Sequence, residues 1–150
     1  MKALIRLSTI SLTSLVLAAC VGSGVSTELT SCTFPDTVRT PAPAFICDQA
    51  LEGYPVARLT RVHASSDSSA ERMEQGRLAI QAELSEEWLS LWYGGAITPE
   101  LEQLIDDWLD EVLRVVRTRN SPTGTLWLLA GMEYTEEEAH RAFEAFVAER

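Results

Sequence analysis

The sequence predicts an α+β fold, in which a long helix packs on a small antiparallel sheet, with a second helix and a C-terminal amphipathic helix. Two observations support this prediction. Residues 54–64 and 125–132 are rich in β-branched and apolar residues without a helical period, and the turn at 120–124 predicts a hairpin. Three further segments repeat apolar residues at helical spacing, and each follows a capping serine or threonine.

Two extended segments are expected before the first helix. Ala44-Phe45-Ile46-Cys47 is a short apolar run that predicts an edge strand, and Tyr54 to Ala64 predicts a longer strand with imperfect alternation. Serines after Ala64 end this strand. Ser68, with Glu71 three residues later, has the pattern of a capping box, so a helix is expected to begin there.

The first helix is expected to run to about Tyr93, where Gly94-Gly95 ends it. Its apolar face is predicted to consist of Met73, Ile80, Leu84, Trp88 and Leu91. A second helix begins at Thr98-Pro99, because a capping hydroxyl precedes a proline at the first helical position. Its apolar stripe consists of Leu101, Leu104, Ile105, Trp108, Leu109 and Val112.

The end of the second helix allows two interpretations. Residues 112–119 fit either another helical turn or a strand, and the turn at 120–124 favours a strand from about Leu113 that pairs with 125–132. The last helix is predicted after Thr135, which Glu138 caps. Its apolar residues are Ala139, Ala142, Phe143, Phe146 and Val147. A face this wide is expected to cover a sheet or to meet a partner.

The N-terminus has the pattern of a bacterial secretory signal. A basic start is followed by an apolar run from Leu7 to Leu17, which is shorter than the roughly 20 residues of a membrane span. Leu17-Ala18-Ala19-Cys20 then matches a lipobox, in which Cys20 receives a diacylglycerol, becomes the N-terminus and is acylated. The alternative is an ordinary cleaved signal with a chance cysteine. Val21 after the cysteine favours the outer membrane.

The expected organisation is a signal peptide at 1–19, a lipid-anchored flexible tether at 20–43 and a single domain at 44–150. The signal carries two of the 12 basic residues and no acidic one, so the mature chain has 10 basic and 22 acidic residues, a net charge of −12. This balance argues against nucleic acid and against docking on anionic head groups. The lipid chains on Cys20 are therefore expected to provide the membrane contact.

Cys32 and Cys47 remain once Cys20 carries lipid. In an oxidising compartment they are disulfide candidates that close a loop of about 15 residues, worth about 3 kcal/mol in the chain-entropy model. Two unrelated thiols are the alternative. The spacing matches no zinc or redox motif.

The residues with catalytic potential form no recognised constellation. His140 has Glu136 and Glu144 four residues to either side, and His63 has Asp67 and serines nearby, but neither pattern is specific for a metal or a triad. The carboxylate clusters lack the alternating ligands of a calcium loop and are interpreted as solvated helix surface. We expect no enzyme activity, no metal and no cofactor.

The aromatic residues are the remaining site candidates. Trp88 and Trp92 lie one helical turn apart, and Trp127 is centred in the last strand. Burial in the core or in a subunit interface, together with Phe143 and Phe146, is the first interpretation. Stacking on a flat ligand is the alternative.

The order of segments resembles a known family. The proline-containing opening Pro43-Ala44-Phe45-Ile46, the alanine-bearing first helix and above all the hairpin Ser121–Ala130 are similar to the Lpp-twenty-like lipoproteins, which include FlgP-type flagellar outer-membrane lipoproteins. The resemblance covers 43–132. It implies a small α+β domain, with a long helix on an antiparallel sheet somewhat like dodecins, and no catalytic residues.

Three functions are compatible with these observations. The first is a non-catalytic lipoprotein at the outer membrane that assembles with itself or with an envelope machine, such as the flagellar basal apparatus. The second is a carrier of a small aromatic ligand. The third is an envelope hydrolase, for which His63 is the only base to nominate. The domain is expected in the periplasm, with display at the surface as the other option.

Overall fold

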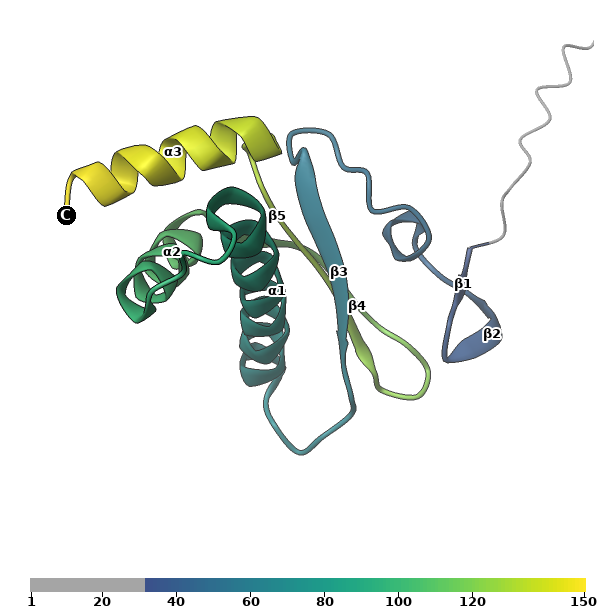
Figure 1. The fold of residues 1–150 in the computed structure, drawn as a ribbon. Helices are drawn as coiled ribbons and strands as arrows, with labels where there is room; N and C mark the ends of the chain where they lie inside the picture. Colours follow the sequence, from purple (N-terminus) through teal and green to yellow (C-terminus); the bar gives the residue numbers. More distant parts are fainter. Residues whose placement is uncertain (1–31) are drawn as a thin grey trace, which may run out of the picture.

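The computed structural model describes residues 32–150. Its main sheet is antiparallel, and its strand order places the last strand in the sequence between the other two. Figure 1 shows the helices on one side of this sheet and the N-terminal segment on the other. The α+β prediction is confirmed. The strands are β3 (Val56–Val62), β4 (Arg114–Asn120) and β5 (Leu126–Met132), and the helices are α1 (Ser69–Tyr93), α2 (Pro99–Val112) and α3 (Glu136–Ala148).

The long helix α1 begins and ends at the signals that the sequence contains. The Ser68 hydroxyl accepts a hydrogen bond from the backbone N–H of Glu71, and the Glu71 carboxylate accepts one of 2.7 Å from the N–H of Ser68. Gly94 ends the helix at a φ of 58°, in the left-handed region that glycine tolerates best. Gly76 allows close packing on the sheet, since a Cβ there would lie 3.2 Å from Cδ1 of Leu128.

The main core lies between the helices and the sheet. Its largest fully buried side chains include Trp88, Phe143, Ile80, Leu84, Ile105, Leu109, Leu113, Leu128 and Met132. The prediction that Leu91 belongs to this face was wrong, because its exposed fraction is 66%, whereas Leu89 is buried. The reason is that α1 contacts α2 as well as the sheet, so its buried stripe turns toward Gln81, Ser85 and Leu89.

The segment after α2 is a strand, as predicted. Leu113 ends the helix in an extended conformation, and β4 follows directly. The turn that joins β4 to β5 is closed by hydrogen bonds from the Ser121 N–H to the Thr125 carbonyl and from the Gly124 N–H to the Ser121 carbonyl. Gly124 has a φ of 84°. A β-bulge lies between Val115 and Arg117.

The N-terminal segment contains more structure than the sequence predicted. Within the expected tether, β1 (Thr33–Phe34) and β2 (Thr37–Pro41) form a hairpin. The predicted strand at Ala44–Cys47 was wrong, because Ala44–Ile46 is a 3₁₀ turn, η1. Pro43 lacks an N–H for strand pairing, and the N–H of Cys47 donates to the Ala44 carbonyl at 3.0 Å instead.

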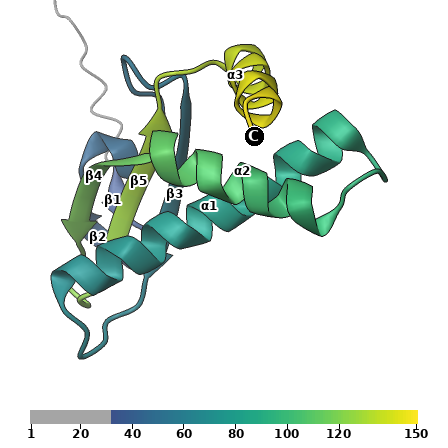
Figure 2. The ribbon, with the colours of Figure 1, turned by 90° about the vertical axis from the view of Figure 1, so that its left-hand side faces the viewer.

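The two faces of the sheet are thus covered differently. The face toward the helices belongs to the main core, whereas the opposite face, which we call the outer face, carries Trp127 under Phe34 and Ile46. Figure 2 shows the N-terminal strands behind the sheet and the helices in front of it. Because Cys32 also packs against this second cluster, the described chain starts on the outer face.

Candidate functional site

Cys20, the predicted lipidation site, lies outside the described residues. Within 32–150, no helix combines the length and the hydrophobicity that crossing a membrane requires. The first described cysteine, Cys32, follows Cys20 by 12 positions, so that at about 3.3 Å per residue the intervening chain spans at most about 40 Å. Cys32 therefore marks the point on the domain, 12 residues from the predicted anchor, at which the described chain begins.

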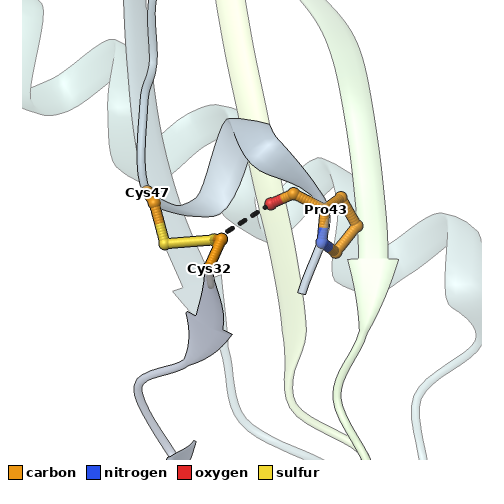
Figure 3. Close-up of a disulfide and its surroundings, with 3 residues drawn as sticks. All are labelled: Cys32, Pro43 and Cys47. Carbon is orange, nitrogen blue, oxygen red and sulfur yellow. Dashed lines mark hydrogen bonds between the residues drawn. A yellow bond between two sulfur atoms is a disulfide. The ribbon is translucent and has the colours of Figure 1, made fainter. Parts of the chain in front are cut away.

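The predicted disulfide between Cys32 and Cys47 is present, with a Cα–Cα distance of 5.8 Å. It joins the start of the N-terminal segment to the end of the 3₁₀ turn. The Cys32 sulfur lies 3.3 Å from the carbonyl oxygen of Pro43, the contact that Figure 3 draws as a dashed line. An oxidised sulfur has no proton to donate, so this is a close S···O contact while the bridge is intact. The bridge holds β1 beside η1 on the outer face.

A polar cluster fastens the same segment to the β4–β5 turn. The carboxylate of Asp36 accepts hydrogen bonds of 2.6 Å from the Ser121 hydroxyl and 2.5 Å from the Thr123 hydroxyl. These bonds, with that from Ser121 the strongest influence, lower the pKa of Asp36 from 3.8 to about 2. From the helix side, Arg72 donates to the Gly124 carbonyl at 2.6 Å. The turn is therefore held from both faces of the sheet.

The aromatic candidates lie mostly inside the protein. Trp88 and Phe143 are fully buried, and Trp127 is 6% exposed beneath the N-terminal segment. Trp92 is half-buried, but its ring already stacks on Trp88 at 4.8 Å and on His140 at 4.6 Å between centroids. These rings pack within the chain, and none of the three tryptophans offers a bare ring to a flat ligand.

Phe146 lies nearer to the surface than Phe143. Its ring is half-buried at the edge of the main core, and the guanidinium of Arg150 lies 4.2 Å from its centroid. Arg150 also lies 3.4 Å from Glu111 and 3.8 Å from Asp107 on α2. The predicted apolar face of α3 is therefore occupied mainly by contacts within the chain.

The histidines do not assemble a site with other ligands. His63 is exposed after β3, and His140 lies 3.6 Å from Glu144 as well as against Trp92. In residues 32–150, no three histidine, cysteine, aspartate or glutamate side chains are grouped as a metal site would require. The arrangement around His140 is that of a packed surface side chain.

Charge is distributed very unevenly between the sheet and the helices. The three strands β3, β4 and β5 contain five arginines and no acidic residue. The helices α1, α2 and α3 contain 15 acidic residues and three arginines. The net charge of the whole chain does not show that basic residues lie in the strands and acidic residues in the helices.

Strand register shows which way the sheet arginines face. Arg61 on β3 and Arg119 on β4 both pair directly with Trp127 on β5, so all three lie in one row on the outer face. Arg117 pairs with Leu129 in the next row of that face. Arg61, Arg117 and Arg119 are exposed, and among the described residues none of them has a carboxylate within 4.0 Å. We call these three residues the arginine face.

The other two sheet arginines are already engaged. Arg58 faces the helices and binds Glu87 of α1 at 3.2 Å. Arg114 donates to backbone carbonyls at the end of α2, including that of Leu113 at 3.2 Å, where the helix dipole favours a cation. Arg117 donates one hydrogen bond of 2.7 Å to the carbonyl of its neighbour Val116. The arginine face therefore differs from Arg58 in having no carboxylate partner, and from Arg114 in lying away from a helix end.

A second surface candidate is a groove between α1 and α2. Leu78, Leu89 and Ile97 contribute apolar side chains to it, and Glu86 and Asp106 contribute carboxyl groups. The exposed fraction is 47% for Leu78 and 36% for Ile97. Leu91, 66% exposed, lies nearby on α1 in an adjoining depression with Glu86.

Neither surface was predicted from the sequence. A signal for the arginine face was available, since Arg117 and Arg119 alternate with other residues at the spacing of one strand face. The pairing of Arg61 across β5 depends on the strand order, which the sequence does not state.

Comparison of the chain with protein-family models, with curated proteins and with solved structures found no match.

Proposed function

We propose that the chain is a non-catalytic bacterial lipoprotein, anchored at the outer membrane through Cys20, with a structural or assembly role in the cell envelope. The observation that carries the proposal is the Leu17-Ala18-Ala19-Cys20 motif after a basic and apolar leader. The resemblance to the Lpp-twenty-like lipoproteins adds the flagellar basal apparatus as a candidate machine.

The disulfide supports export. A bridge between Cys32 and Cys47 persists in an oxidising compartment and is rare in the bacterial cytosol. It also holds the start of the described chain on the domain, so that a lipid on Cys20 would be separated from the domain by the 12 positions before Cys32.

Membrane fractionation of the expressed full chain tests the anchor. The wild-type protein should float with membranes and incorporate labelled palmitate, whereas Cys20→Ser should lose the label. The Cys32→Ser/Cys47→Ser double variant is the matched control, because it removes the other two cysteines and should keep the label. Palmitate on the Cys20→Ser chain, or none on the wild type, would contradict the anchor.

The assembly role is supported by the exposed apolar side chains of the α1–α2 region. Leu78, Leu91 and Ile97 are partly or largely in contact with solvent, beside carboxylates rather than beside catalytic groups. Leu78 and Ile97 share the groove, and Leu91 lies in the adjoining depression. Apolar side chains exposed beside polar residues in this way favour a protein–protein contact. This region replaces the face of α3 as the proposed contact surface.

Light scattering of the chain from Val21 onward, produced without Cys20 and its lipid, tests self-assembly. A discrete oligomer that Leu78→Glu/Leu91→Glu converts to a monomer would support contacts through this region. Val38→Glu is the control, because Val38 is 74% exposed but lies on β2, across the sheet from α1. A monomer of the unaltered chain would exclude self-assembly and leave a different envelope protein as the partner.

A further inference from the structure

The arginine face has a composition that the rest of the molecule lacks. Arg61, Arg117 and Arg119 present guanidinium groups on the outer face of the sheet, in a mature chain whose predicted net charge is −12. On the N-terminal segment that covers Trp127, Arg39 is a further exposed arginine. Unpaired arginines in an acidic protein leave an attraction for anions that the protein itself does not satisfy.

The carboxylates near this face are few and partly engaged. Asp36 binds the hydroxyls of Ser121 and Thr123, and Asp48 accepts a hydrogen bond from the backbone of Ala50. Glu52 precedes β3, whose first residue pairs with the last residue of β5, at the opposite end of the sheet from Arg61. These carboxylates stay charged, but among the described residues none of them lies within 4.0 Å of a guanidinium nitrogen of Arg61, Arg117 or Arg119.

The acidic residues of the helices lie on the other side of the sheet. Packed layers are separated by roughly 10 Å, and the screening length in physiological salt is about 8 Å. An anionic surface in contact with the outer face is therefore exposed mainly to the arginines. The expectation from net charge, that anionic head groups are disfavoured, does not hold for this face.

The start of the described chain indicates which anionic surface is near. Cys32 packs against the cluster of Phe34, Ile46 and Trp127 on the outer face, and Figure 1 shows this segment on the side of the sheet away from the helices. The described chain begins at Cys32 on the same face as the arginines, 12 positions after the predicted anchor at Cys20. The arginine face is therefore the face nearest to the point at which the described chain begins.

We propose that the arginine face docks on anionic phospholipid head groups of the membrane that holds the anchor, so that the acidic helices and the α1–α2 groove point away from the bilayer. This inference rests on the proposed lipid anchor. Guanidinium groups bind phosphate oxygens in bidentate fashion, and each basic residue near an anionic surface strengthens binding about fivefold. The docked orientation presents the apolar region of α1 and α2 to partners.

Arginine footprinting of the full-length lipidated protein tests this orientation. The protein is reconstituted into vesicles of phosphatidylcholine alone or with 30% phosphatidylglycerol, and reaction with phenylglyoxal is read for each arginine by mass spectrometry. Labelling of Arg61, Arg117 and Arg119 should fall about fivefold on the anionic vesicles and recover in 1 M salt. Arg141 on α3, whose side chain is 65% exposed, should label equally on both.

A charge reversal provides the matched control. Arg119→Glu should restore labelling of Arg61 and Arg117 on anionic vesicles, whereas Arg141→Glu makes the same change in net charge and should leave the protection intact. If Arg61, Arg117 and Arg119 label fully on both kinds of vesicle, the docking proposal is overturned. Labelling of the three arginines that is equally low on both kinds of vesicle would overturn it in favour of a contact with a second copy. Labelling that falls only in native envelopes would overturn it in favour of an acidic protein partner. Failure to float with neutral vesicles would instead contradict the anchor.

Discussion

Asp36 accepts a 2.6 Å hydrogen bond from the hydroxyl of Ser121, a residue 85 positions later in the chain. The contact joins the β1–β2 turn to the β4–β5 turn, and the Thr123 hydroxyl reinforces it. Together with the disulfide, it fixes the N-terminal segment over Trp127. The segment that leads toward the predicted anchor is therefore closed on itself by the disulfide and attached to the sheet by Asp36 and by the packing on Trp127.

The first prediction concerns pH. The folded pKa of Asp36 is about 2, below the ordinary 3.8, so its carboxylate stabilises the fold fully above about pH 4 and loses that effect as the pH falls through 2. Asp36→Asn should therefore melt at a lower temperature than the wild type at pH 6, and the difference should shrink toward pH 2. Thermal unfolding followed by circular dichroism measures both. A difference that stays constant from pH 6 to pH 2 would exclude this role.

The second prediction concerns the disulfide. Cys32→Ser/Cys47→Ser should lower the free energy of unfolding by about 3 kcal/mol, because the open chain gains entropy when unfolded. Reduction of the wild type should have the same effect and should shift tryptophan emission to the red as Trp127 loses its cover. The double variant should not respond to the reductant. Unchanged melting of the wild type after reduction would show that the bridge is dispensable.

The third prediction concerns Gly131, near the end of the central strand β5. A Cβ there would lie 2.8 Å from the backbone carbonyl oxygen of Val56, which cannot move without disturbing β3. Gly131→Ala should therefore destabilise the domain by about 1–3 kcal/mol in denaturant titration. Gly95→Ala is the control, since its Cβ meets nothing within 4 Å. Equal stability of the two variants would contradict the close approach.

The fourth prediction separates the two phenylalanines of α3. Phe143 is fully buried, so Phe143→Ala should cost about 3–5 kcal/mol. Phe146 is half-buried against Arg150, and its replacement by alanine should cost clearly less. Denaturant titration compares them, and light scattering should show the same solution mass for both. Equal stability losses, or a change of mass for Phe146→Ala, would indicate that Phe146 takes part in a subunit contact.

Local signals in the sequence were sufficient for much of the fold. The capping boxes at Ser68 and Thr135 and the turn before β5 mark element boundaries by hydrogen bonds between near neighbours, and the structure contains them. Leu91 was misplaced because a helical period identifies an apolar stripe but not the neighbours that bury it. Contact with α2 moved the buried stripe to Leu89.

The N-terminal segment and the arginine face depend on contacts that are distant in the sequence. The range 33–41 has no hydrophobic period, and its hairpin is held by the bond between Cys32 and Cys47 and by Asp36 on a turn far along the chain. Arg61 and Arg119 become neighbours of Trp127 only through the order β3–β5–β4. The net charge is a sum over the whole chain and does not record which face of the sheet carries each residue. It therefore gave no indication of a basic face.

The central claim is that this domain is held to a membrane by lipid on Cys20. The most direct measurement is the intact mass and N-terminal fragmentation of the mature protein purified from bacterial membranes. We predict a chain that begins at Cys20 and carries a diacylglyceryl group with an N-acyl chain. A mature chain that begins at another residue, or one that begins at Cys20 without lipid, would contradict the account.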